Sequence, residues 1–353
     1  MLKILIAGSP SKIFHLEEFA KSLENIKVQC RVVIDTSVYS GFPSRNISKW
    51  FETKKRFNNL ISEFKPDVIF VDRQTNFGLA STELDIPVLV HLRGDFWEEA
   101  EMAKKTLYKS PIMRGVIWYK ERIANKCFDK STIILPICKY LEKRVHNFFP
   151  DKKTDVLYQG IDPSKWYDEK GMNLKHPCIG LVQSANIWEK TKQLMYLPKV
   201  LEAFPDVTFY WVGDGPYRKE VLPFLEIYDN FNWLGKLDYP KKIRQFLTEI
   251  DIYALLTGID MSPLSLQEAQ LMKKPVIATN VGGIPELMED KKTGFLVEKD
   301  NHLQIIEKIS LLLNNQDKRK EMGNNGREFI SKNFSWDVIS KNFVEMMNRY
   351  TNN

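Results

Sequence analysis

The chain has 353 residues, of which 43% are hydrophobic and 27% charged, a composition typical of folded globular proteins and not of disordered ones. This length predicts two domains rather than one. The formal net charge is +6, and all of it lies in residues 1–170, which hold 28 basic and 22 acidic side chains. Such asymmetry is compatible with an anionic partner without identifying it.

Short β-rich runs alternate with amphipathic helical patterns through the first half of the chain. Leu16, Phe19 and Leu23, for example, recur at the spacing of one apolar helix face. The predicted strands span residues 2–7, 28–34, 67–71, 87–92, 132–136 and 155–158. Regular alternation of strand and helix predicts parallel βαβ units with a covered sheet.

The same alternation restarts in the second half. The predicted strands span residues 178–182, 207–212, 231–234, 252–256, 275–278 and 294–297. The predicted helices span residues 192–204, 217–226, 240–249, 264–273, 301–315 and 317–332. We therefore predict an α/β protein with domains at 1–170 and 171–335. An amphipathic helix in 336–353 follows, which we expect to cross back to the first domain.

Several protein classes are disfavoured by what the sequence lacks. No apolar run approaches the ~18–20 residues of a membrane span, and the first residues do not have the features of a signal peptide. The four cysteines and five histidines show no ligand spacing. We therefore expect free thiols in a reducing cytoplasm, no metal site and no cofactor.

Doubly wound sheets bind ligands at the carboxyl ends of their strands, so glycines at these positions indicate where a ligand could approach the backbone. Gly8 stands alone after the first strand, and Gly213-Asp214-Gly215-Pro216 has no third glycine. A dinucleotide fingerprint and a Walker A sequence are therefore both missing. Gly8 remains a candidate for close backbone approach to a ligand, with a plain strand-end turn as the alternative.

Residues 251–297 run strand, polar turn, helix, strand, glycine turn, helix, strand, and they carry two acidic residues of interest. Glu268 on the helix could accept two hydrogen bonds from a ribose diol, and Asp260 in the turn could hold sugar hydroxyls. The helix N-terminus near Leu264 and Ser265 offers N–H groups and a positive dipole end to a diphosphate. A capping aspartate and a partly solvated surface glutamate are the alternative interpretation.

At this stretch the sequence resembles glycosyltransferase family 4, which are retaining enzymes of the GT-B superfold. The family has an acidic residue followed, after seven further residues, by Glu-Ala. Asp260 and Glu268-Ala269 match this pattern. Weaker matches lie in the first half, at Pro87–His91 and Gln159–Asp162. The other matches are Val212–Pro216, Leu234-Gly235, Lys274–Thr279, Val281–Glu286, Thr293–Val297 and Phe334–Trp336.

The resemblance implies two Rossmann-like doubly wound domains facing a central cleft. It implies transfer of a sugar, with retention of configuration and without a metal, from a UDP- or GDP-sugar to a glycan or lipid-linked acceptor. The second domain would bind the donor at Gly213 and the 260–268 motif, with Glu268 on the ribose and Asp260 on the donor sugar. The first domain would bind the acceptor, and His91 would face the reacting sugar.

Two features depart from the family pattern. Asp260 is one methylene shorter than the usual glutamate. The usual arginine of the diphosphate clamp is missing; Lys192 best fits the position of its lysine partner, and Lys190 is the alternative. These departures keep a second interpretation open, namely a non-catalytic nucleotide-sugar-binding protein or a partner subunit of a glycosyltransferase.

Residues 102–126 carry seven basic side chains against one acidic residue, Glu121. Apolar and aromatic residues are interleaved with them: Leu107, Tyr108, Ile112, Met113, Ile117, Trp118 and Tyr119. We predict peripheral binding to an anionic membrane at its cytoplasmic face, with a membrane-proximal acceptor and no nucleic-acid partner. The alternative is a packed helix pair with a solvated basic face.

Overall fold

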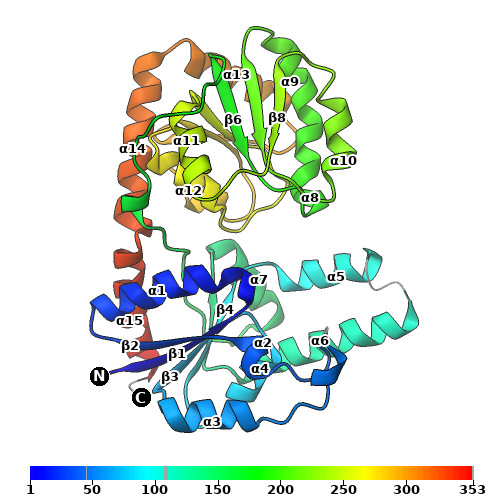
Figure 1. The fold of residues 1–353 in the computed structure, drawn as a ribbon, viewed down its shortest axis with the longest axis vertical. Helices are drawn as coiled ribbons and strands as arrows, with labels where there is room; N and C mark the ends of the chain where they lie inside the picture. The colour runs from blue at the N-terminus through cyan, green and yellow to red at the C-terminus, as the bar shows by residue number, and fades with distance from the viewer. Residues whose placement is uncertain (45, 107–109, 352–353) are drawn as a thin grey trace. The chain divides into compact units, whose positions relative to one another are not determined.

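The computed structural model describes residues 1–44, 46–106 and 110–351. The chain divides into two compact units, one formed by Met1–Gly160 with Trp336–Asn353 and the other by Ile161–Ser335 (Figure 1). Residues 161–170, which the sequence pattern grouped with the first domain, therefore lie in the second unit. The C-terminal helix belongs to the first unit.

The first unit is built on a parallel sheet with strand order β2-β1-β3-β4-β5. Its strands are β1 (Lys3–Gly8), β2 (Gln29–Ile34), β3 (Val68–Asp72), β4 (Val88–Leu92) and β5 (Ile133–Pro136). The order reverses between β1 and β3, which makes the carboxyl ends of these two strands the expected place for a ligand.

The predicted strand at 155–158 is wrong. The segment has the alternating pattern of a half-buried strand, but it meets β5 only through a bridge between Ile134 and Thr154 and a bond from Leu157 N to the Pro136 carbonyl. Both contacts keep the same register, but Pro136 has no N–H to donate to this segment, so the ladder does not extend beyond the single bridge. Leu157 itself is buried in the core of the unit.

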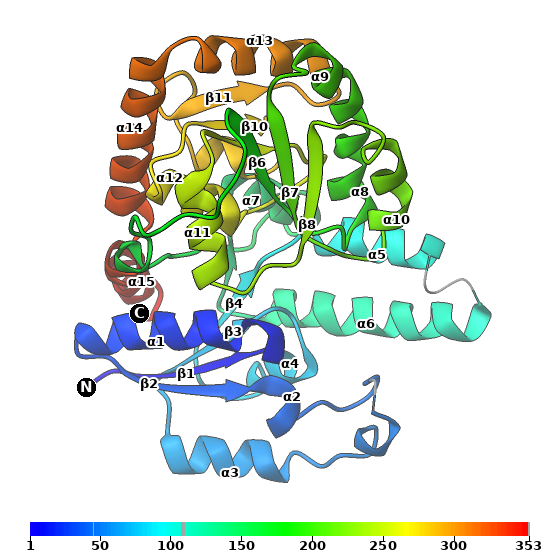
Figure 2. The same cartoon turned by 45° about the horizontal axis from the view of Figure 1, so that its top comes forward.

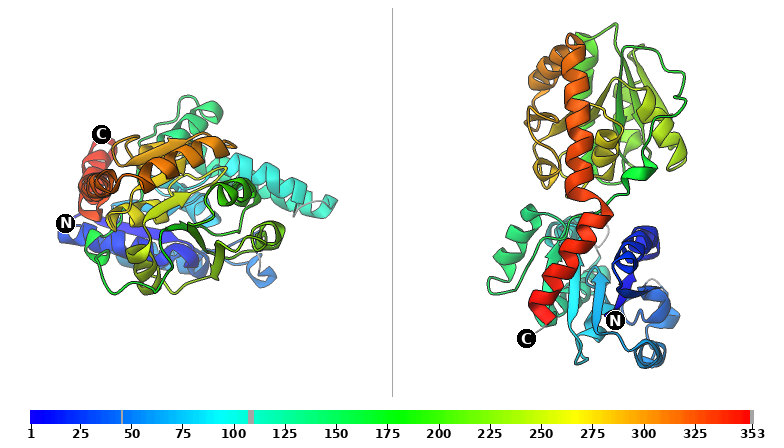
Figure 3. Two further views of the ribbon diagram at one scale, coloured as in Figure 1. Left: turned by 90° about the horizontal axis from the view of Figure 1, so that it is seen from above. Right: turned by 90° about the vertical axis from the view of Figure 1, so that its left-hand side faces the viewer.

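Amphipathic helices cover the first sheet. They are α1 (Ile13–Asn25), α2 (Asp35–Val38), α3 (Lys55–Phe64), α4 (Asn76–Ser81), α5 (Phe96–Thr106), α6 (Pro111–Lys130), α7 (Lys139–Phe148) and α15 (Trp336–Thr351). Helix α15 lies beside α1 (Figure 3). Its residues Ile339, Phe343, Met346 and Met347 are buried in the same core as Phe19 of α1.

The second unit contains a parallel sheet with strand order β11-β10-β9-β6-β7-β8 (Figure 2). Its strands are β6 (Cys178–Val182), β7 (Thr208–Val212), β8 (Phe231–Gly235), β9 (Ile252–Leu255), β10 (Val276–Thr279) and β11 (Gly294–Val297). Here the order reverses between β6 and β9, so their carboxyl ends are the expected ligand position in this unit.

The helices of the second unit follow the predicted pattern with two interruptions. They are α8 (Trp188–Thr191), α9 (Leu197–Ala203), α10 (Arg218–Val221), α11 (Lys241–Glu249), α12 (Leu264–Leu271), α13 (His302–Leu313) and α14 (Gln316–Phe334). The predicted helices 192–204 and 217–226 each break into a 3-10 turn and a short helix, at Pro198 and Pro223. Proline lacks the N–H donor and clashes with the preceding turn, so it starts a new helix at these positions.

Candidate functional site

Glu268 lies on α12, which follows the carboxyl end of β9 in the second unit. The residue is only 4% exposed, so the interpretation as a solvated surface glutamate is wrong. Burial raises the pKa of the Glu268 carboxyl to about 8, although a hydrogen bond from Tyr239 acts to lower it. The side chain is therefore mostly protonated at neutral pH until a ligand supplies donors or a positive charge.

Asp260 precedes α12, and its carboxylate is paired with a lysine. The distance from Asp260 Oδ2 to Lys190 Nζ is 2.6 Å, and both side chains are largely buried. The glycine turn after β10 fixes this position, because Gly283 N donates to the Asp260 carbonyl at 2.9 Å. A Cβ on Gly282 would lie 2.1 Å from the same carbonyl, at a φ of +56° that favours glycine.

The N-terminus of α12 lies between these two carboxylates in the sequence. Pro263 occupies the N-cap position and has no side-chain acceptor for the first N–H groups. Ser265 Oγ accepts a hydrogen bond from the buried hydroxyl of Tyr253 at 2.7 Å. The first backbone N–H groups of α12 and the positive end of its dipole make the start of this helix a suitable place for an anion.

The two candidate phosphate lysines have different partners. Lys192 forms an ion pair with Glu189, one turn away. Lys190, the alternative candidate, is the lysine that the structure brings to the acidic motif through Asp260.

Gly213 is needed for packing of the protein on itself. It has a φ of +152°, and a Cβ there would lie 1.9 Å from the carbonyl oxygen of Gln183. Gly215, with a φ of +155°, approaches the Ala185 backbone in the same way. The two glycines thus let the turn after β7 lie against the loop that follows β6, the loop that leads to Lys190.

His91 is the penultimate residue of β4 in the first unit and is buried, with 4% exposure. Its Nδ1 lies 3.2 Å from Asp72 Oδ1, and its Nε2 lies 3.2 Å from the Leu157 carbonyl. Burial lowers the pKa of His91, although the hydrogen bond to Asp72 acts to raise it. Both ring nitrogens therefore face protein groups in this structure.

Asp72 is a residue that sequence reasoning missed. It ends β3 and is fully buried. Its Oδ1 lies 3.5 Å from Arg93 Nη1, and Arg93 Nη2 donates to Gln159 Oε1 at 2.5 Å. Its position at a strand end was the available signal. Gly8 lies against this group: a Cβ there would be 2.2 Å from Leu16 Cδ1 and 3.2 Å from Asp72 Cβ.

His176, Cys178 and Asp251 form a group at the amino ends of β6 and β9, and the sequence patterns did not predict it. His176 Nδ1 lies 2.9 Å from Asp251 Oδ2 and 3.7 Å from Cys178 Sγ, and the candidate ligand atoms lie within 4.8 Å of one another. The other ring nitrogen, Nε2, lies 2.9 Å from Glu249. Hydrogen bonds to the two carboxylates, that of Glu249 first, raise the pKa of His176, so this group is already satisfied as a charge network.

The basic stretch 102–126 is formed by the end of α5 and most of α6, and Leu107, Tyr108 and Lys109 lie outside the described residues. Ile112 is 82% exposed and Trp118 is 56% exposed, whereas Ile117 is buried. The Arg122 guanidinium lies 5.5 Å from the centre of the Trp118 ring. No helix within the described part of the chain is long and apolar enough to cross a membrane.

Comparison with known sequences finds similarity to glycosyltransferases, chiefly in the second unit. Residues 167–329 match the family model Glycosyl transferases group 1. An uncharacterised glycosyltransferase of Methanocaldococcus jannaschii is 28% identical over 203 residues, which are 56% of this chain and 54% of that protein. Spore coat protein SA of Bacillus subtilis is 24% identical over 240 residues, or 59% of this chain and 62% of that protein. The chain thus spans about half to three fifths of the length of these curated relatives.

Solved structures match along almost the whole chain. Sucrose-phosphate synthase from Thermosynechococcus elongatus has a TM-score of 0.76 at 13% identity and covers 99% of both chains. HepE of Anabaena in complex with UDP has a TM-score of 0.72 at 16% identity and covers 99% of this chain and 100% of its own. The same protein was solved with UDP-glucose, with a TM-score of 0.71. These likenesses confirm the predicted GT-B fold class.

Proposed function

We propose that the chain is a retaining glycosyltransferase that takes its sugar from a UDP- or GDP-sugar bound in the second unit. The observation that carries the proposal is the arrangement around α12, where a buried Glu268 and the Asp260–Lys190 pair flank an uncapped helix start. The match of residues 167–329 to Glycosyl transferases group 1 supports it. So does the likeness in fold to HepE, which was solved with UDP and UDP-glucose.

Each group at this site has a role in the proposal. Glu268 accepts hydrogen bonds from the two ribose hydroxyls, and Asp260 holds hydroxyls of the donor sugar. The first N–H groups of α12 and Lys190 stabilise the negative charge that develops on the leaving diphosphate. These groups carry that charge without a metal ion, so we propose a metal-independent reaction.

A non-catalytic nucleotide-sugar binder is the second candidate. The observation that favours it is the ion pair between Lys190 and Asp260, which occupies the lysine in a clamp that already lacks an arginine. A binder and an enzyme are distinguished by turnover, so release of free nucleotide from the donor, with and without acceptors, decides between them.

The donor site is tested by a thermal-shift screen of the full chain with UDP-, GDP-, ADP- and TDP-sugars. A ligand at 100 times its Kd stabilises the native state by about 2.7 kcal/mol, which gives a clear rise in Tm. We expect a rise with the UDP- or GDP-sugar. If none of the four raises Tm at millimolar concentration, the proposed function is wrong.

Asp260→Asn is expected to lower kcat by about tenfold or more while free UDP or GDP binds with nearly unchanged affinity. The reason is that the carboxylate is placed to contact the sugar, whereas the nucleotide is held by Glu268 and the start of α12. Calorimetry with free nucleotide and turnover at saturating donor are measured on the same variant. A variant that loses nucleotide affinity but keeps its turnover would contradict this role.

We also propose that the basic stretch 102–126 binds anionic membranes, because it combines exposed Ile112 and Trp118 with basic side chains. The variant Lys104→Glu/Lys105→Glu should then bind phosphatidylglycerol vesicles at least about fivefold more weakly per lysine, at ~1 kcal/mol each. The matched control is Lys320→Glu/Lys332→Glu, which changes the net charge equally at exposed positions of α14. Co-sedimentation at low salt measures both, and equal recovery with neutral and anionic vesicles would reject the membrane proposal.

A further inference from the structure

A cavity of about 900 Å³ lies within the first unit and was not identified from the sequence. Its wall is formed by the segments that follow β1, β2 and β3, so it lies at the point where the strand order β2-β1-β3-β4-β5 reverses. This is the position at which doubly wound sheets bind ligands. The volume is also within the range of small-molecule sites.

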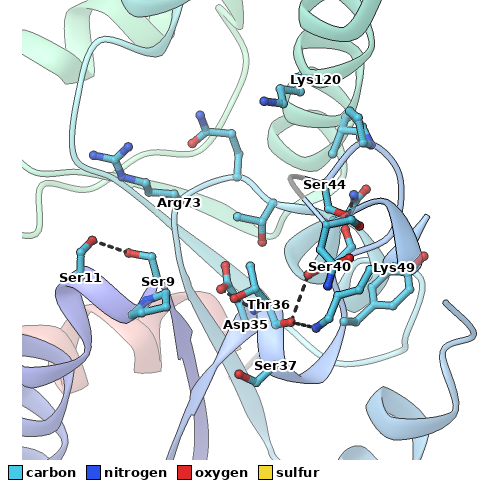
Figure 4. A pocket seen from close by; sticks show the side chains of 18 of the residues that line it. Ser9, Ser11, Asp35, Thr36, Ser37, Ser40, Ser44, Lys49, Arg73 and Lys120 are labelled. Atoms are coloured by element: carbon cyan, nitrogen blue, oxygen red, sulfur yellow. Dashed lines mark hydrogen bonds between the residues drawn. The ribbon is translucent and has the colours of Figure 1, made fainter. Parts of the chain in front are cut away.

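The cavity wall is strongly basic. Lys12, Lys49, Arg73 and Lys120 line it, whereas Asp35 is the one acidic residue among its described lining residues. Figure 4 shows that Arg73, Lys49 and Lys120 come from three different parts of the unit and lie on different sides of the cavity. The excess of positive charge favours an anion inside.

Hydroxyl groups line the floor between these cations. They belong to Ser9, Ser11, Thr36, Ser37, Ser40 and Ser44 (Figure 4). Part of the floor is fixed by the Thr36 carbonyl, which accepts from Ser40 Oγ at 3.1 Å and from the ammonium group of Lys49. Hydroxyl donors beside lysine and arginine are the groups that bind phosphate oxygens.

Arg73 has an unusual backbone conformation. Its φ is +87°, which is strained for a residue with a Cβ, and its N–H is held by the His91 carbonyl at 3.0 Å. This conformation directly follows β3 and leaves the side chain exposed at the cavity. Beside it, Gln74 Oε1 is a buried acceptor without a partner among the described residues.

Two acceptor groups therefore accompany the cations. Gln74 Oε1 can accept from a ligand hydroxyl, and Asp35, which is 2% exposed, adds a carboxylate at the end of β2. The cavity thus holds cations that can bind an anionic group and acceptors that can bind hydroxyl groups. It therefore favours a ligand that carries an anionic group together with hydroxyl groups.

We propose that this cavity binds the acceptor substrate and that the acceptor is a hydroxylated phosphate ester, either a soluble polyol or sugar phosphate or the headgroup of a phospholipid. Its role as acceptor rests on the proposed function. In the transfer, an acceptor hydroxyl oxygen bonds to C1 of the donor sugar and the bond from C1 to the diphosphate breaks. The hydroxyl proton then leaves with the nucleoside diphosphate.

The test is calorimetry of the full chain with glycerol phosphate and with glycerol. Both titrations are made in saturating UDP or GDP, whichever matches the sugar nucleotide that raises Tm, so that the nucleotide site is occupied. We expect glycerol phosphate to bind and glycerol not to bind. Arg73→Gln and Lys49→Gln should each weaken binding of glycerol phosphate by about tenfold, because each removes a charge-assisted contact. Arg31→Gln is the control, since Arg31 is a partly exposed residue of β2 that pairs with Glu63 and does not line the cavity.

Equal affinities for glycerol and glycerol phosphate, or unchanged binding by both cavity variants with unchanged Tm, would overturn the proposal. Phosphatidylglycerol vesicles distinguish a lipid headgroup from a soluble phosphate ester as the acceptor. If Arg73→Gln weakens vesicle binding and glycerol phosphate displaces the vesicles, the acceptor is a headgroup. If vesicle binding is unchanged in Arg73→Gln, the acceptor is a soluble ester. Binding of UDP and of GDP is measured in parallel. Absence of both would count against the proposed function alone, whereas binding of either one without binding of glycerol phosphate would count against the cavity.

Discussion

Glu268→Ala is expected to abolish binding of the nucleotide sugar while the protein stays folded. The variant removes a buried carboxylate that is placed to accept two hydrogen bonds from the ribose, and hydrogen bonds to charged groups contribute about 1.5–3 kcal/mol each. Calorimetry with the donor identified by thermal shift measures the loss, and circular dichroism checks the fold. Donor affinity within a factor of two of the wild-type value would remove Glu268 from the site.

The raised pKa of Glu268 makes donor binding depend on pH. With a pKa of about 8, the carboxyl is mostly protonated at pH 6, and the ribose hydroxyls need the ionised form as acceptor. Donor affinity should therefore rise about tenfold per pH unit from pH 6 to 8 and level off above. A flat profile for the wild-type protein over this range would contradict the role of the carboxylate.

The stability of the fold should show the opposite dependence on pH. Because the folded pKa is raised from 4.5 to about 8, the contribution of Glu268 to stability is fully present below about pH 4.5 and is lost as the pH rises to 8. Glu268→Gln cannot ionise and should have the higher Tm at pH 8. The same variant should lack the pH dependence of donor affinity, which makes it the control for the binding experiment.

His91→Ala should lower kcat by a factor of ~10–1000, the range for one polar contact made mainly in the transition state. The structure adds a second effect. A neutral imidazole has one N–H, so either the fully buried Asp72 or the Leu157 carbonyl loses its donor, and unfolding in urea should show a destabilisation of about 1–3 kcal/mol.

His91→Gln separates the two effects, because it retains an amide donor for Asp72 or for the Leu157 carbonyl. If it restores stability but not kcat, His91 acts at the reacting sugar. Unchanged kcat in His91→Ala, together with the loss of stability, would show that the histidine only supports the end of β4.

The architecture was predictable because its signals are local. Apolar runs of four to six residues mark the strands, and Leu16, Phe19 and Leu23 mark the buried face of α1. The failures have local causes too: Pro198 and Pro223 interrupt predicted helices, and Pro136 lacks the N–H that would extend the ladder between β5 and residues 155–158. The pattern within 155–158 does not report this missing donor, because it lies on the neighbouring strand.

The candidate site was predictable only where its residues are close in sequence. Asp260 and Glu268 are eight residues apart and read as one motif. The partner of Asp260, Lys190, is 70 residues away, and sequence position favoured Lys192 instead. Asp72 and His91 come together because β3 and β4 are neighbours in the sheet, and the basic cavity of the first unit depends on three separate strand ends.

The discontinuous first unit has a consequence for the order of events on the ribosome. The second unit is one uninterrupted stretch, Ile161–Ser335, and its core can be completed once Ser335 has emerged. The first unit needs Phe343 and Met347 to fill the space beside Phe19, and these residues are synthesised only after the whole second unit. Residues 1–160 are therefore made before the second unit but finish folding after it, and until then they expose apolar surface to chaperones.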